Sequence, residues 1–174
     1  MKKIFLVPLV ALSIVSLVSC MKDKTPSCTD NSLTQDRQVI DSFITASPSL
    51  NYVTFNSTFN IYMGIENPGT GSMPAADSQI VFKRESRLLS GTLLDSATIS
   101  ITQQGFPLKL SDYNSTSVDY AIFTQLKEGG AMKLIIPSSL NGLGCQSGNW
   151  RYASSPANSQ IITTISLIDV KRSQ

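Results

Sequence analysis

The sequence predicts an α+β fold in which an antiparallel sheet curls over one short helix, with a second, amphipathic helix ahead of the sheet. Three observations lead to this prediction. Stretches that alternate apolar and polar residues recur after Pro48, one amphipathic helical window precedes them, and one short helical window interrupts them late in the chain. The 174 residues suffice for one domain with a targeting segment and a linker.

The chain begins with the features of a signal peptide. Lys2 and Lys3 form a short basic region, and the apolar run that follows covers residues 4–18. A run of this length is too short to span a membrane, which takes about 20 residues, and is typical of the core of a secretory signal. We therefore predict a signal peptide over residues 1–19.

The signal ends in a cysteine. The tetrapeptide from Leu17 to Cys20 resembles the bacterial lipobox, whose cysteine is lipidated and becomes the mature N-terminus. The alternative is an ordinary secretory signal with a cysteine at its end by chance. A lipidated Cys20 predicts a protein of the bacterial cell envelope, held on a membrane by its acyl chains, on the periplasmic or the surface side.

Charge and composition exclude several classes of function. The chain has 14 basic and 12 acidic residues, and loss of Lys2 and Lys3 with the signal leaves 12 of each. Without a net charge or a basic stripe, nucleic-acid binding is not expected. There is no histidine, which excludes histidine-dependent triads and histidine-ligated zinc, and three cysteines are too few for a four-cysteine site. We expect no metal and no cofactor.

Two cysteines remain once Cys20 is taken as the lipid anchor. In an oxidising compartment Cys28 and Cys145 either pair or stay as free thiols. A bridge that closes so long a loop contributes about 4–5 kcal/mol in the chain-entropy model.

The segment that follows the signal divides into a tether and a helix. Residues 20–34 are polar and are expected to link the lipid to the domain. Residues 35–48 carry an apolar stripe at helical spacing, with Thr34 as the expected cap and Ser47-Pro48 as the end. The stripe consists of Val39, Ile40, Phe43 and Ile44.

The sequence predicts that the remaining domain, residues 49–174, consists mainly of strands. Candidate strands cover 53–59, 61–65, 79–89, 132–137 and 160–170, with a turn at Ser90-Gly91. The late helical window runs from Ser117 to Lys127 and is expected to end before Gly129-Gly130.

Four segments resemble, in order and at similar intervals, the FKBP-type peptidyl-prolyl cis-trans isomerases. The family patterns are a turn before the second strand, G-x-L-x-D-G-x-x-F-D-S, M-K-x-G-x-K-x-x-L-x-I-P, and I-P-P-N-S-x-L-x-F-x-V-x-L-x-x-V. In this chain the matching segments are Glu66–Gly71, Arg87–Ser96, Leu126–Ser138 and Ser155–Val170. The resemblance implies an FKBP-like domain of the envelope lipoprotein type, with a curved half-barrel sheet around the short helix.

The resemblance also implies an activity. A rotamase lowers the barrier to X-Pro rotation, about 18–20 kcal/mol, and needs neither a nucleophile nor a proton shuttle. An apolar aromatic pocket that binds the proline and desolvates the amide is enough. The implied role is in protein folding, and the implied partners are proline-containing polypeptide segments or envelope proteins. We expect a monomer.

Site residues follow from the resemblance position by position. Asp95 matches the family's acidic pocket residue, with Leu94 where the family has phenylalanine. The alternative is that Asp95 and Ser96 simply cap a turn. Most of the family's other pocket residues are aromatic. Their positions fall on Arg84, on Leu108 or Leu110 with Phe106 slightly displaced, on Asp119 with Tyr120 beside it, on Gly142 or Leu143, and on Thr163.

Two interpretations of the pocket remain open. In one, an active isomerase has rebuilt its pocket; in the other, the chain is a peptide- or protein-binding lipoprotein that keeps the fold with weak or no catalysis. Each lost aromatic wall removes 150–250 Å² of burial, on the order of several kcal/mol of substrate binding for two walls. The rebuilt pocket would use Phe106, Tyr120, Phe123, Trp150 and Tyr152.

Overall fold

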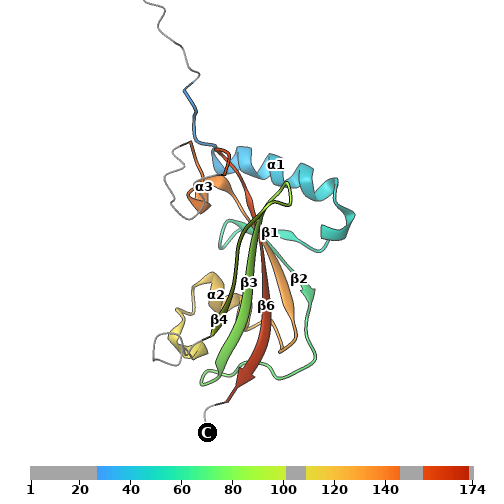
Figure 1. Ribbon diagram of the computed structural model, residues 1–174, viewed down its shortest axis with the longest axis vertical. Helices are drawn as coiled ribbons and strands as arrows, with labels where there is room; N and C mark the ends of the chain where they lie inside the picture. The colour runs from blue at the N-terminus through green and yellow to red at the C-terminus, as the bar shows by residue number, and fades with distance from the viewer. Residues whose placement is uncertain (1–26, 101–108, 146–154, 173–174) are drawn as a thin grey trace, which may run out of the picture.

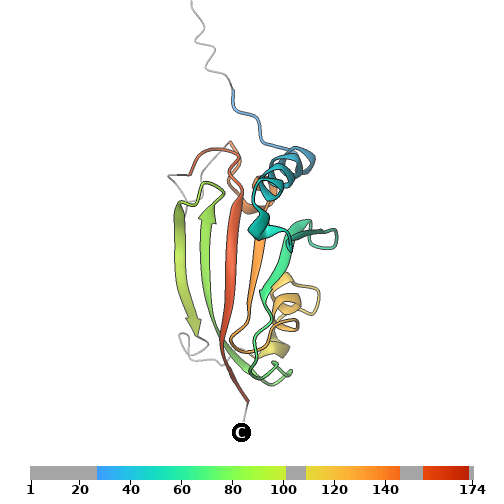
Figure 2. The same ribbon diagram turned by 90° about the vertical axis from the view of Figure 1, so that its right-hand side faces the viewer.

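The six strands of the protein form one antiparallel sheet, in the order β1-β2-β5-β6-β3-β4 (Figures 1 and 2). The structure, a computed structural model, describes residues 27–100, 109–145 and 155–172. The strands are β1 Thr54–Asn56, β2 Ile61–Asn67, β3 Gln79–Leu88, β4 Leu93–Ser100, β5 Ala131–Ile136 and β6 Ile161–Lys171. The helices are α1 Leu33–Thr45, α2 Val118–Phe123 and α3 Ser138–Asn141, with single 3₁₀ turns η1 Pro48–Leu50 and η3 Leu110–Asp112. The α+β fold predicted from the sequence is confirmed.

The two longer helices cover opposite faces of the sheet, as Figure 1 shows. Successive residues of a strand point to opposite faces, and the neighbours Leu134 and Ile135 on β5 belong to two different buried clusters. The cluster with Leu134 contains Ile122 and Phe123 of α2, so α2 lies on that face, which we call the concave face. The cluster with Ile135 contains Ile40 of α1, which lies on the other, convex face.

The concave core combines strand residues with the aromatic end of α2. Phe123 is buried, with its ring centroid 4.8 Å from that of Phe82 on β3 and 5.6 Å from that of Tyr113. Such tilted ring pairs add about 0.5–1.5 kcal/mol to the energy of burial. Phe123 is therefore a core residue that fixes α2 to the sheet.

Both helices differ in extent from the prediction. Ser32, not Thr34, caps α1, because Ser32 and Gln35 form a reciprocal capping box, and the helix begins at Leu33. The late helix, expected over 117–127, ends at Phe123. The amide of Gln125 bonds to the carbonyl of Ile122, three residues back, and this tighter bond takes the chain out of the α-helix.

Strand β4 and helix α3 were missing from the sequence-based description. Small polar residues interrupt β4, which lies at the edge of the sheet and pairs Ser96 and Ala97 with Glu85 and Arg84 of β3. Helix α3 has four residues and ends at Gly142, whose φ of 76° is favourable for glycine. Both elements border the cavity described below or contact residues in it.

Within the described ranges, none of the helices combines the length and the apolar character needed to cross a membrane.

Candidate functional site

A cavity of about 270 Å³ opens on the concave face, between β3, β5 and β6 on one side and α2 and α3 on the other. Most of its walls are aliphatic, because alternate residues of β5 and β6 point to this face. No aromatic side chain of the described residues lines it. The apolar lining consists of Val118, Leu134, Ile136, Leu140, Ile161 and Ile165, and the polar lining of Arg84, Ser86, Asp119, Asn141 and Thr163.

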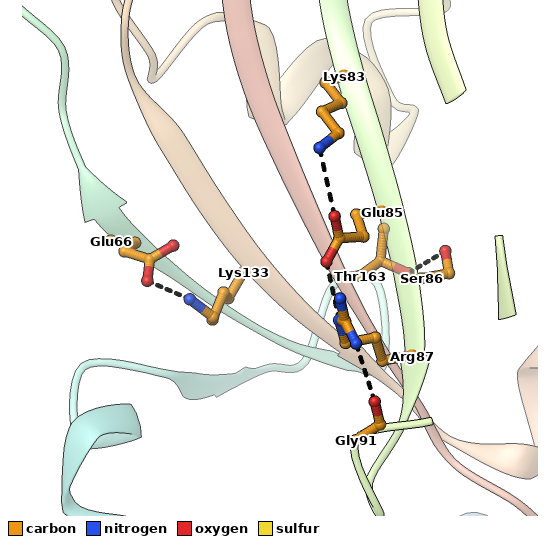
Figure 3. A network of polar contacts seen from close by, with 8 residues as sticks. All are labelled: Glu66, Lys83, Glu85, Ser86, Arg87, Gly91, Lys133 and Thr163. Carbon is orange, nitrogen blue, oxygen red and sulfur yellow. Dashed lines mark hydrogen bonds and ion pairs between the residues drawn. The ribbon is translucent and has the colours of Figure 1, made fainter. Parts of the chain in front are cut away.

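The floor of the cavity carries a pair of hydroxyl groups. Ser86 on β3 lies opposite Thr163 on β6, and their side-chain oxygens are 3.1 Å apart (Figure 3). Both residues are buried. Each hydroxyl thereby has a partner, which removes most of the cost of burying it. Thr163, predicted as a pocket residue, is thus part of a neutral, satisfied floor.

An ion pair lies beside this floor. Nη2 of Arg84 donates to Oδ2 of Asp95 at 3.0 Å, and both side chains are about 30% exposed. Asp95 pairs with Ser86 in the register of β3 and β4, so its side chain points to the concave face like that of Ser86. The Nε atom of Arg84 is buried, and no described residue accepts its hydrogen. The ion pair joins two residues, Arg84 and Asp95, that the sequence analysis assigned to the pocket.

Asp119 lies at the rim, in the first turn of α2, whose N-cap is Ser117. It is exposed, and within the described ranges its carboxylate has neither a hydrogen bond nor an ion pair. Desolvation by its surroundings raises the pKa of Asp119, and the positive charge of Arg84 partly offsets this rise. Burial, together with the charges of Asp119 and Asp112, also raises the pKa of Tyr113, to about 12.

Other predicted site residues lie around the cavity rather than on it. Tyr120 is half-buried and packs against the concave core, and Leu143 is fully buried just after α3. Leu94 is half-buried at the irregularity between β3 and β4. Of the predicted pocket residues, Arg84, Asp119 and Thr163 line the cavity. The predictions for Cys20, Phe106, Leu108, Trp150 and Tyr152 lie outside the described residues.

Sequence reasoning missed most of the aliphatic lining. The sequence pattern that could have identified it lies in β5 and β6, where alternate residues share one face of the sheet. The aliphatic residues on the same face as Thr163 are Leu134, Ile136, Ile161 and Ile165. Leu140 and Asn141 could not be found in this way, because they belong to α3, which was not predicted.

A second polar cluster fastens the N-terminal segment to the domain. Cys28 and Cys145 form a disulfide, which is one of the two alternatives that the sequence left open. Asp36 in α1 is fully buried and accepts four hydrogen bonds, from Asn31, Ser138, Ser139 and Gln160, at 2.7–3.0 Å. We call the disulfide and Asp36 with these four donors the N-terminal clasp.

The environment of Asp36 stabilises its charged form. Burial alone raises the pKa of this carboxyl group, but the hydrogen bonds from Ser139, Ser138, Asn31 and Gln160 outweigh burial and lower it below its usual value. A polar hollow of about 450 Å³ adjoins the clasp and is larger than the concave cavity. Asp30, Asn31, Ser138, Ser139 and Asn158 in its lining are already bonded to other residues of the clasp region. Its polar groups therefore serve to hold the chain together.

The convex face carries exposed ion pairs away from the cavity. Glu85 lies between Lys83 and Arg87 along β3, and Lys133 on β5 pairs with Glu66 on β2 (Figure 3). Hydrogen bonds from Arg87 and Lys83 lower the pKa of Glu85. Exposed pairs of this kind contribute little to stability, because water screens the two charges. We find no group of three or more acidic or cysteine side chains that could hold a metal ion in the part of the chain that the structure describes.

Solved structures resemble this arrangement of sheet and helices. The crystal structure of a peptidyl-prolyl cis-trans isomerase from Pseudomonas syringae pv. tomato superposes with a TM-score of 0.50 at 20% identity, covering 83% of this chain and 99% of the other. FkpA from Escherichia coli gives 0.47 at 21% identity over 81% of this chain and 60% of that one. The three FKBP domains of wheat FKBP73 give 0.44 at 17% identity, over 68% of this chain and 49% of that one.

The protein thus has the fold of the FKBP-type isomerases, as the four sequence segments predicted. No protein-family model and no curated protein sequence matches the chain.

Proposed function

We propose that this protein is a membrane-anchored folding helper that binds proline-containing polypeptide segments in the concave cavity and catalyses X-Pro rotation weakly. The observation that supports this proposal best is the position and lining of the cavity. It lies between the sheet and α2 of an FKBP-like fold and has aliphatic walls over a neutral hydroxyl floor. At about 270 Å³ it lies just below the range of about 300–1,000 Å³ typical of small-molecule pockets, which suits a short stretch of chain.

The chemistry of the walls fits this activity. Leu134, Ile161 and Ile165 present apolar surface that a proline ring can cover. An X-Pro amide held there loses its hydration, which favours the twisted state in which conjugation, and with it charge separation, is lost. No acid or base is required.

Two features explain why the activity is expected to be weak. The described part of the cavity has no aromatic wall, and each such wall would bury 150–250 Å² against the substrate. In addition, the carboxylate of Asp95 is bound to Arg84, so it is not free to interact with a bound amide.

The same ion pair supports a second candidate function. A protein whose acidic pocket residue is neutralised by Arg84 can bind extended peptides without catalysing rotation. Measurements of binding and of catalysis on the same sample separate the two functions.

The experiment uses the whole chain in a non-ionic detergent and two readouts. One is the refolding rate of a small protein whose folding is limited by a prolyl bond, and the other is calorimetric binding of acetyl-Gly-Gln-Leu-Pro-Gln-Gly-amide. We expect binding together with a modest acceleration that grows with protein concentration. Binding without acceleration would leave the second candidate, and absence of both would contradict the proposal.

A matched pair of variants locates the effect. Val118→Asn places a polar side chain in the apolar wall at the first position of α2, and Val39→Asn makes the same change on the exposed face of α1. We expect Val118→Asn to weaken peptide binding and acceleration together, and Val39→Asn to leave both unchanged. Equal effects of the two variants would contradict the assignment of the cavity.

The proposal includes a lipid anchor on Cys20. The tetrapeptide from Leu17 to Cys20 supports it, and the disulfide-bonded Cys28 is only eight positions after Cys20. Fully extended, that stretch reaches at most about 29 Å, which would keep the domain close to a membrane surface. Cys20→Ser should move the protein from the membrane to the soluble fraction of cells, and retention in the membrane would contradict the anchor.

A further inference from the structure

We infer that Asp119 selects proline-containing segments in which a cationic side chain, lysine or arginine, lies beside the apolar residue held in the cavity. The inference rests on the proposed function, since it concerns the peptide that the same cavity binds. It follows from the charges at the cavity, from the position of Asp119, and from the apolar residue that shares the rim with it.

Three charged side chains of the described residues lie at the cavity, and two of them neutralise each other. Arg84 and Asp95 form an ion pair at 3.0 Å, so the positive charge of Arg84 is already engaged. Asp119 has no such partner within the described ranges. Among the described residues, Asp119 is therefore the one charged group at the cavity without an ion pair, and a positive charge on the bound chain would pair with it.

The position of Asp119 makes this charge available to a ligand. Asp119 lines the cavity next to Val118, and its side chain is exposed, so a peptide can reach it without any movement of the protein. The nearby acidic residue Asp112 differs in this respect, because its carboxylate accepts the amide hydrogen of Lys109. Asp95 is likewise occupied by Arg84.

The rim also offers surface for the aliphatic stem of a basic side chain. Leu140 of α3 lines the same cavity and is 51% exposed, the highest value among the exposed large hydrophobic residues of the described chain. Lysine and arginine cover apolar surface with their methylene groups while their charged ends stay in water. A rim that combines Leu140 with Asp119 suits this kind of side chain better than a short polar or an acidic one.

The expected preference is modest, because the carboxylate is exposed to solvent. Exposed ion pairs typically contribute about 0.2–1 kcal/mol, which corresponds to a change in affinity of about 1.4-fold to fivefold. An acidic side chain at the same place meets like charge and should bind more weakly than a neutral one. The preference should decrease as salt is added.

The test compares three peptides of the form acetyl-Gly-Xaa-Leu-Pro-Xaa-Gly-amide, in which Xaa is lysine, glutamine or glutamate. Binding to the whole chain in non-ionic detergent is measured by calorimetry at low and high ionic strength. We expect the order lysine, glutamine, glutamate, with about 1.4-fold to fivefold between neighbours at low salt. In Asp119→Asn the three affinities should become equal. Asp169→Asn, which removes a charge from the exposed pair with Lys171 at the C-terminal end of strand β6, is the matched control and should keep the order.

Two further variants test the charge balance with opposite signs. Arg84→Gln releases Asp95 from its ion pair, so the ratio of lysine-peptide to glutamate-peptide affinity should rise. Asp95→Asn releases Arg84, whose charge then opposes that of Asp119, so the ratio should fall. Because the readout is a ratio, an overall loss of affinity in either variant does not obscure it.

The outcomes separate this inference from the function on which it rests. If the three peptides bind the unchanged protein equally well, or if Asp119→Asn keeps the order, the inference is wrong while the proposed function stands. If none of the peptides binds, the proposed function fails and the inference fails with it.

Discussion

Two aspartates in the first turns of their helices have opposite environments in this protein. Asp36 and Asp119 both lie in the first turn of a helix, and each helix is capped by a serine, Ser32 for α1 and Ser117 for α2. Asp36 is fully buried and accepts four hydrogen bonds. Asp119 is exposed at the rim of the concave cavity, with no partner among the described residues.

The comparison separates a structural role from a binding role. Hydrogen bonds lower the pKa of Asp36 against the effect of burial, whereas desolvation without such bonds raises the pKa of Asp119. A carboxylate that accepts all its hydrogen bonds from the protein holds parts of the chain together. A carboxylate that accepts no hydrogen bond from the described residues is available to a ligand. Changes to the N-terminal clasp should therefore alter stability, and changes to the cavity should alter binding.

The largest expected effect is loss of the disulfide. The bridge joins residues 117 positions apart, and the chain-entropy model assigns about 4–5 kcal/mol to a loop of this size. The double variant Cys28→Ser with Cys145→Ser should lower the free energy of unfolding by about that amount, as measured by urea denaturation. Reduction of the unchanged protein should give the same value. If both treatments leave the stability unaltered, the clasp does not hold the domain.

The next largest effect is expected for Asp36→Asn. The amide keeps the shape of the carboxylate but presents a donor to groups that already donate, and hydrogen bonds to a charged group contribute about 1.5–3 kcal/mol each. We expect a loss of about 3 kcal/mol in the free energy of unfolding. Peptide affinity of the folded protein should change little. If Asp36→Asn lost peptide binding without losing stability, Asp36 would have a binding role and the structural role assigned to it would be wrong.

The free energy of unfolding should depend on pH through Asp36. Its pKa in the folded protein lies below the ordinary value of 3.8 that applies in the unfolded chain. Its contribution is therefore fully present above that value and is lost as the pH falls through the lowered pKa. Denaturation curves between about pH 2 and pH 6 should show this loss, and the loss should be smaller in Asp36→Asn. Parallel curves for the two proteins would contradict the assignment.

The smallest effect on stability is expected for Asp119→Asn. Removing the charge relieves desolvation but also removes a favourable interaction with the start of α2, which is typically about 0.3–1 kcal/mol. The two effects oppose each other, so we expect a change within about 0.5 kcal/mol, as for most surface substitutions. A loss as large as that of Asp36→Asn, measured under the same conditions, would show that Asp119 is structural.

Sequence reasoning found the fold better than the site. Strand alternation, the two helical stripes and the four FKBP-like segments sufficed for the α+β sheet around α2. They also placed Arg84, Asp119 and Thr163, which line the cavity, because these lie in strands or helices of regular register. The aliphatic walls were within reach of the same reasoning in β5 and β6.

The clasp could not be found in this way. Aspartate is almost never fully buried unless paired, so nothing local marks Asp36 as a core residue. Its donors Ser138 and Gln160 come from more than 100 positions away and meet it only in the folded protein. The ion pair of Arg84 with Asp95 was missed for a related reason, since it depends on the register of β4, a strand interrupted by small polar residues.

The central claim is that the concave cavity binds peptide while the N-terminal clasp only stabilises the fold. The most direct test is amide chemical-shift mapping of the isotope-labelled chain during titration with acetyl-Gly-Lys-Leu-Pro-Lys-Gly-amide. We predict that the shifts concentrate at cavity residues such as Ser86, Asp119 and Thr163, with little change at Asp36 and Gln160. Shifts confined to the clasp or to the convex face, with the cavity unaffected, would contradict the claim.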